Sequence, residues 1–186
     1  MARIVLAPLL LVPALLAGPA HAGGLSSSSS GEARAQVIAP LVVTRESDLE
    51  FGAVFAGSSP GTVIVSTRGE ATYTGGAQPA CASGACFAVR AAQFAVRGEA
   101  GRSYVVAVPT RLTATGTTTD GSGREAEPLA VVAIEVRSSS RPAEPAAGQL
   151  DAQGQDRFEV GGTLEMPANL PSASYRATIP VVVTYG

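Results

Sequence analysis

The chain has 186 residues, a formal net charge of −2, one histidine and no lysine. This charge balance gives no electrostatic reason to expect binding to nucleic acid or to an anionic membrane. The absence of lysine excludes Schiff-base and lysine-base mechanisms. The histidine, His21, lies in a segment that we expect to be removed, which would leave no imidazole to act as a base or as a metal ligand.

Residues 1–22 have the features of a secretory signal peptide. Arg3 precedes an apolar run, and Ala20-His21-Ala22 has the small-x-small form of a signal-peptidase site. Two prolines interrupt the run, which is also too short for a stable membrane span. We therefore expect a chain that is exported to the periplasm, the cell surface or the medium and is not an integral membrane protein.

The rest of the chain is expected to form a flexible leader and one domain. Residues 23–34 are rich in serine and glycine and cannot bury a core, so they are interpreted as a plain linker or as a spacer that lets the first strand reach a neighbour. Residues 35–186 have the length of a single domain. Their many valine, threonine, glycine and serine residues favour sheet over helix.

The first strand is predicted over residues 35–44, where both faces are apolar. Pro40 cannot donate a backbone hydrogen bond, so this strand should lie at an edge or switch sheets there. Every second residue from position 37 points to one side, namely Val37, Ala39, Leu41 and Val43.

Short apolar or alternating segments then follow one another to the end of the chain. The stretch 69–86 is predicted to be turn-rich, whereas residues 175–185 alternate as one closing strand. About eight to ten short strands separated by turn signals predict an all-β protein, an antiparallel β-sandwich. The other expected strands lie near residues 49–54, 61–67, 94–97, 104–108, 111–115, 129–137 and 158–166.

Few residues suggest chemistry. Cys81 and Cys86 lie five positions apart in an exported chain and predict a local disulfide, because a zinc site or a catalytic dithiol would need further ligands or a different spacing. The acidic loop 120–127 could hold calcium, but a solvated loop explains it better. Asp48 and Glu50 could act as paired carboxylates, although an outward polar strand face is the simpler interpretation. We expect no cofactor, no metal and no enzymatic activity.

Four short motifs follow one another from about residue 35 to the end of the chain. They are Leu49-x-Phe51-Gly52; Phe94-x-Val96-x-Gly98-Glu99-x-Gly101-x-x-Tyr104; Val160-Gly161-Gly162-Thr163-Leu164 with Pro167; and the strand from Tyr175 to Tyr185. In their order and spacing they resemble a family of secreted bacterial proteins, domain of unknown function 4402. That family is similar, more distantly, to the spore-coat-protein-U type and other subunits of chaperone-usher fimbriae.

This resemblance implies an immunoglobulin-like, pilin-like sandwich that lacks a final strand and receives one from a neighbour. It places Tyr175 and Tyr185 in assembly contacts, because Tyr185 is similar to the aromatic residue that ends many pilins. Ser174 departs from the pattern, which often has glycine there. The serine-rich leader is no donor, so a donor strand would be formed by Val37, Ala39, Leu41 and Val43.

We therefore expect a structural or adhesive surface protein that resembles a fimbrial subunit. Its expected partners are copies of itself, other fimbrial-type subunits and a periplasmic chaperone. In the isolated chain, the first strand is expected to pack within its own molecule. The alternative function is a self-contained periplasmic or extracellular binding module, such as one for carbohydrate, although the chain has only four tyrosines and no tryptophan to stack on sugars.

Overall fold

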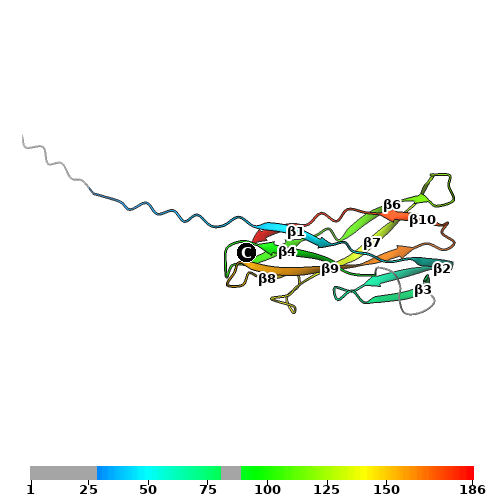
Figure 1. Cartoon of the computed structure of the whole chain (residues 1–186), viewed down its shortest axis with the longest axis horizontal. Coiled ribbons are helices and arrows are strands. Elements are labelled where there is room, and N and C mark those ends of the chain that lie inside the picture. Colours follow the sequence, from blue (N-terminus) through cyan, green and yellow to red (C-terminus); the bar gives the residue numbers. More distant parts are fainter. Residues whose placement is uncertain (1–28, 81–88) are drawn as a thin grey trace, which may run out of the picture. The chain divides into compact units, whose positions relative to one another are not determined.

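The computed structural model describes residues 29–80 and 89–186 (Figure 1). Residues Val37–Gly186 form one compact unit. Before that unit, residues 29–36 are exposed and have no regular structure. The predicted signal peptide and the predicted Cys81–Cys86 disulfide lie outside the described residues and stay predictions.

All regular elements in the described part of the chain are strands, and all of their pairings are antiparallel. The all-β class and the β-sandwich that the sequence predicts are thereby confirmed. The strands are β1 (Val42–Ser47), β2 (Val54–Val65), β3 (Ala71–Pro79), β4 (Ala92–Arg97), β5 (Ser103–Ala107), β6 (Arg111–Thr118), β7 (Glu125–Ser138), β8 (Ala147–Gln149), β9 (Gln155–Met166), β10 (Ala173–Arg176) and β11 (Val182–Tyr185).

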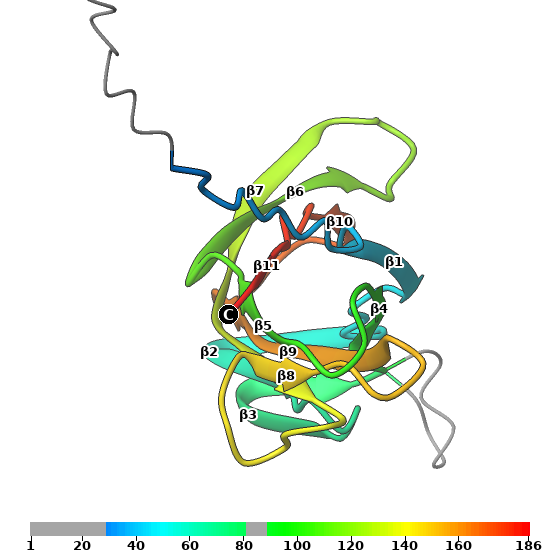
Figure 2. The same ribbon diagram turned by 90° about the vertical axis from the view of Figure 1, so that its left-hand side faces the viewer.

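The larger sheet has eight strands and is organised around β9. Its main order is β1-β4-β9-β7-β6-β10, and the β2–β3 hairpin joins through β2. One edge of β9 is shared between two partners, because residues 155–160 pair with β4 and residues 162–166 pair with β2. Figure 2 shows the sheet curling so that its end strands, β1 and β10, approach the same opening.

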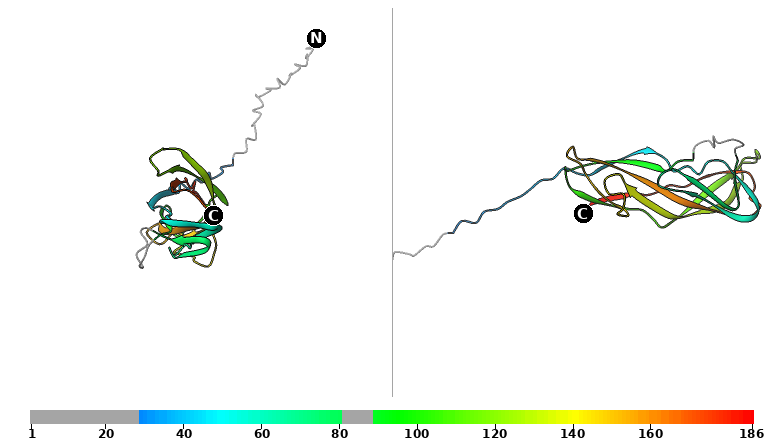
Figure 3. Two further views of the ribbon diagram at one scale, coloured as in Figure 1. Left: turned by 90° about the vertical axis from the view of Figure 1, so that its right-hand side faces the viewer. Right: turned by 90° about the horizontal axis from the view of Figure 1, so that it is seen from below.

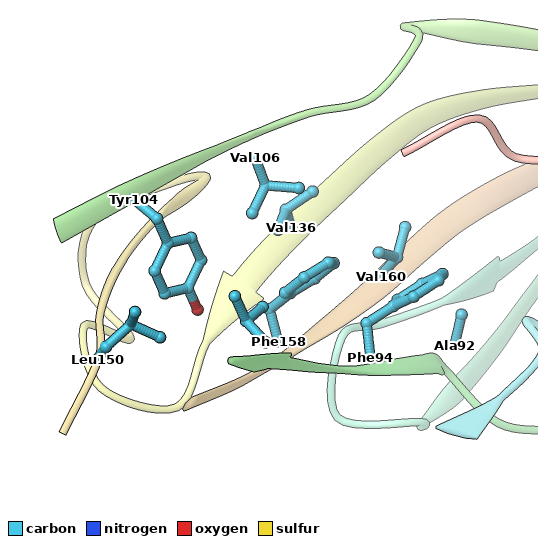
Figure 4. Packing of buried hydrophobic residues seen from close by; sticks show 9 residues of the cluster. Ala92, Phe94, Tyr104, Val106, Val136, Leu150, Phe158 and Val160 are labelled. Carbon is cyan, nitrogen blue, oxygen red and sulfur yellow. The ribbon is translucent and has the colours of Figure 1, made fainter. Parts of the chain in front are cut away.

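The smaller sheet has three strands in the order β11-β5-β8. It packs on one half of the larger sheet, at the end of the domain where the chain terminates (Figure 3). Between the two sheets lies the main hydrophobic cluster (Figure 4). Phe94 of β4 and Phe158 of β9 stack there with ring centroids 5.0 Å apart. Tyr104 and Val106 of the smaller sheet pack against this cluster from the opposite layer, together with Leu150, which follows β8.

Within residues 29–80 and 89–186, no second sheet lies over the other half of the larger sheet. Its two hydrophobic clusters are formed around Ala114, Leu129 and Val131 and around Val63, Ala77 and Met166, and no residue of β5, β8 or β11 belongs to either. Their cover comes from irregular segments that include Phe51 and Leu170. The sandwich is therefore complete at one end and open at the other.

The strand predicted over residues 35–44 begins only at Val42. Its partner β4 ends at Arg97, which pairs with Val42, so the residues before Val42 have no strand beside them. Pro40 also has no backbone N–H to donate to a neighbouring strand. Val37, Ala39 and Leu41 consequently lie outside any strand, and only Val43 of the predicted donor set is within β1.

The predicted closing strand is divided between the two sheets. Tyr175 lies in β10, which pairs with β6, whereas Tyr185 lies in β11, which pairs with β5. Residues 177–181 between them pair with no strand, and Pro180 within this stretch cannot donate a backbone hydrogen bond. The alternating residues that predict one long strand thus form two short strands, one in each sheet, and the chain crosses from the larger sheet to the smaller one between them.

The turn-rich prediction for residues 69–86 is wrong over Ala71–Pro79, which form strand β3. The glycines of this stretch suggest turns, but in the structure they allow β2 and β3 to approach closely. A Cβ on Gly76 would collide with the carbonyl oxygen of Ser59. Gly75 also adopts a positive φ of 61° beside the irregularity in the β2–β3 register.

Candidate functional site

A groove lies over the open half of the larger sheet. Its volume is about 1220 Å³. One wall consists of residues 48–56 and the other of residues 170–179. The floor is apolar and consists of side chains from β6, β7 and β9, namely Leu112, Ala114, Leu129, Val131, Leu164 and Met166.

The floor is apolar because each strand beneath it turns alternate side chains toward the missing layer. Ala114, Leu129 and Val131 are almost fully buried at 3–4% exposure. Their neighbours across the sheet are in register, with Ala114 opposite Leu129 and Val131 opposite Leu164. These side chains are those that a second sheet would cover in a complete sandwich.

Each wall combines a short paired stretch with irregular backbone. Residues 54–56 of the first wall pair with β3, and residues 173–176 of the second wall pair with β6. In the first wall, Glu50 and Arg90 exchange a pair of backbone hydrogen bonds of 2.9 and 3.1 Å. The second wall is fixed where the Asn169 amide donates to the Gly57 carbonyl at 2.8 Å.

Two strand edges border the groove without a second partner among the described residues. β1 pairs only with β4, and β10 pairs only with β6. From β1, Arg45 lines the groove, whereas Val42 and Val43 at the start of the strand are exposed, at 52% and 38%, and lie outside the lining. An open edge with apolar side chains is a template for pairing with an added strand, so this arrangement suits the binding of an extended peptide.

Tyr175 lies in the second wall, with its ring packed against Gly116 of β6. Its hydroxyl is buried and has no hydrogen-bond partner. Burial raises the pKa of this phenol above its ordinary value. By contrast, the hydroxyl of buried Tyr104 donates to the Asp156 carboxylate at 2.8 Å. Burial and this hydrogen bond raise the pKa of Tyr104 well above its ordinary value.

These two tyrosines should respond differently to loss of the hydroxyl. We expect Tyr104→Phe to lower the free energy of unfolding by about 1 kcal/mol, because Asp156 loses a donor. Tyr175→Phe should be neutral or slightly stabilising, since it removes a buried polar atom that has no partner. Urea unfolding followed by circular dichroism measures both changes. Equal losses in the two variants would contradict the assignment.

Tyr185 lies away from the groove, at the end of the smaller sheet. Its hydroxyl accepts a hydrogen bond from the Glu99 amide at 2.7 Å and donates one to the Ala39 carbonyl at 2.6 Å. The Glu99 carboxylate in turn accepts the Ala39 amide at 3.0 Å. The guanidinium of Arg102 lies 5.7 Å from the centre of the Tyr185 ring, within the range of a cation–π contact.

The structure therefore divides the six residues that the sequence suggested for assembly. Ala39 and Tyr185 touch directly, and Leu41 packs near them against the main hydrophobic cluster. Val37 is 96% exposed, Val43 pairs with Val96 of β4, and Tyr175 lines the groove.

Sequence reasoning missed the groove floor. Alternation along β6, β7 and β9 identifies side chains that face a core, but it does not reveal that one layer ends before covering them. It also missed Glu99, whose carboxylate and amide both take part in the Tyr185 contact. Glu99 belongs to the motif Phe94 to Tyr104, which was the only available signal for it.

The other candidates for chemistry are engaged locally. Asp48 pairs with Arg45 at 2.8 Å, and Glu50 lies 3.8 Å from the guanidinium of Arg90. The Asp120 carboxylate binds Ser122, Thr118 and Arg124 within its own loop, and the Ser122 hydrogen bond is the main cause that lowers the pKa of Asp120 to about 2. Within residues 29–80 and 89–186, no group of three or more His, Cys, Asp or Glu side chains is arranged to hold a metal ion.

These features define a class: an antiparallel β-sandwich that is open at one end in the described part of the chain, with a groove that has an apolar floor and walls of mixed polarity. The chain belongs to the family described as Domain of unknown function (DUF4402), which it matches over residues 41–185. No curated protein matches the chain. The described residues contain no helix with the length and apolar character needed to cross a membrane.

Proposed function

We propose that the protein is an exported, non-enzymatic structural or adhesive subunit of the cell surface, and that its groove binds an extended polypeptide strand. The observation that carries this proposal is the open half of the sandwich, where apolar floor residues such as Leu129 lie between the unpaired edges of β1 and β10. A strand laid there would pair with backbone groups at the edges, and its alternate side chains would displace or pack over Phe51, Leu170 and Tyr175, which cover the floor in the isolated chain.

The chemistry of the groove favours a polypeptide over a small molecule. Its volume of about 1220 Å³ is above the range of roughly 300–1,000 Å³ that is usual for small-ligand pockets. The carboxylates of its first wall, Asp48 and Glu50, are each near an arginine rather than grouped for acid–base catalysis. Main-chain pairing provides affinity for a strand without any specialised side chain.

The proposed partner is a second copy of this chain, which would contribute its residues 33–41. In this stretch Ala33, Ala35, Val37, Ala39 and Leu41 share one side of an extended chain, and their small or medium size suits a floor that already contains large side chains. Other fimbrial-type subunits and a periplasmic chaperone could offer strands of the same chemistry. Export through the predicted signal peptide would bring the protein to these partners.

The test uses the chain from residue 23 onward with a synthetic peptide of residues 33–41. We expect the peptide to slow hydrogen exchange of β1 and β10 and, at one hundred times its dissociation constant, to raise the free energy of unfolding by about 2.7 kcal/mol. A control peptide with Val37→Asp and Leu41→Asp should do neither, because charged side chains cannot occupy the apolar floor.

Two measurements together would contradict the proposal. If saturating peptide leaves the exchange of β1 and β10 unchanged and the chain stays a monomer at high concentration, strand binding by copies of this chain is wrong. Binding of oligosaccharides in the same assay, with protection of the groove walls, would then favour the carbohydrate-binding module.

A further inference from the structure

The segment just before β1 is held to its own domain through a single residue. Both main-chain polar groups of Ala39 are bonded, the carbonyl to the Tyr185 hydroxyl at 2.6 Å and the amide to the Glu99 carboxylate at 3.0 Å. The same hydroxyl accepts the amide of Glu99 at 2.7 Å. Three hydrogen bonds thus join the start of the compact unit, the β4–β5 turn and the last strand.

Little else holds this segment. Residues 37–41 form no strand, and Val37 is 96% exposed. Leu41 packs against the main hydrophobic cluster at the far end, and Ile38 is half-buried. A segment with few buried contacts and a few polar anchors belongs to the least stable part of a fold and can open without global unfolding.

The β4–β5 turn is built to receive the Tyr185 hydroxyl. The hydroxyl lies over Gly98, where a Cβ would collide with it. The same Cβ would lie 3.0 Å from Leu41 Cδ2 and 3.1 Å from Leu150 Cδ1. Glycine at position 98 therefore allows the hydroxyl, Leu41 and the core to meet at one point.

From this geometry we infer that Tyr185 and Glu99 form a latch that sets how often residues 37–41 leave their own domain. This inference rests on the proposed function, because the segment that the latch retains is the segment offered to a second copy. With the latch closed, Ala39 is bonded to its own molecule. With the latch open, its main chain is free to pair with the groove edges of another.

The test is hydrogen exchange of the dilute chain from residue 23 onward, where association does not contribute. Tyr185→Phe keeps the ring and its contact with Arg102 but removes both bonds of the hydroxyl. We expect exchange of the Ala39 amide, the bonded amide of residues 37–41, to become about tenfold faster, the effect of losing roughly one net hydrogen bond. Glu99→Ala should have a similar effect, whereas Glu99→Gln keeps an acceptor for the Ala39 amide and should largely restore protection.

Thr184→Val is the matched control, because Thr184 is an exposed neighbour on the same strand and makes no latch contact. Unchanged exchange of β5 and β11 in every variant shows that the smaller sheet is intact. If Tyr185→Phe and Glu99→Ala leave the exchange of residues 37–41 at the level of the parent chain, the latch is wrong. If exchange accelerates but no variant binds a second copy or the peptide of residues 33–41, the latch stands and the proposed function fails.

Discussion

Replacing Phe158 with alanine is expected to lower the free energy of unfolding by about 3–5 kcal/mol. Phe158 is fully buried at the centre of β9 and stacks on Phe94, with ring centroids 5.0 Å apart. Its removal leaves a cavity between two sheets that cannot close around it, because β9 is paired on both edges. A loss of this size is a large part of the roughly 5–15 kcal/mol that stabilises a typical domain.

Urea unfolding of Phe158→Ala gives the value directly, and Phe55→Ala is the control. Phe55 is 64% exposed, so its truncation should change the free energy of unfolding by less than about 0.5 kcal/mol. A small effect at Phe158, or equal effects at the two positions, would contradict the placement of the main core between β9 and the smaller sheet.

Gly161→Ala is expected to destabilise the protein by about 1–3 kcal/mol through crowding. Gly161 lies where β9 changes its partner from β4 to β2, since Val160 pairs with Ala92 and Gly162 pairs with Val65. A Cβ at position 161 would lie 2.5 Å from the Val65 carbonyl oxygen and 2.8 Å from the Thr67 amide nitrogen. Both are backbone atoms, so relief requires β2 to move.

The adjacent glycine gives a matched control. A Cβ on Gly162 would approach no atom more closely than 3.4 Å, the distance to Val131 Cγ1, which is an ordinary contact. Gly162→Ala should therefore be close to neutral. Urea unfolding measures the difference, and hydrogen exchange should show that Gly161→Ala weakens β2 in particular. Equal stability of the two variants would contradict the close approach of the β2 backbone to Gly161.

Much of the fold could be predicted because strands have a simple signal. The apolar run 129–137 and the segment 158–166 both form strands, as expected from alternation and turn residues. The resemblance to the family of domain of unknown function 4402 was also confirmed, over residues 41–185. These properties depend on local pattern and on motif order, both of which can be seen in one sequence.

The ends of strands and the choice of partner could not be predicted in the same way. β1 starts at Val42 because β4 supplies no residue beyond Arg97, a fact about a segment fifty positions away in the chain. The division of residues 175–185 between two sheets likewise depends on what lies beside each half. The groove follows from the shortness of the smaller sheet, so no local signal marks its floor.

The central position of β9 also determines when the protein can fold. β2, β4 and β7 each pair with β9, yet all three precede it in the chain. Until residues 155–166 are in place, these earlier strands have no partner for one edge, and such edges promote aggregation. The pairings are also long-range, which slows folding. A newly made chain would therefore pass through an interval in which the unpaired edges of β2, β4 and β7 are exposed to aggregation.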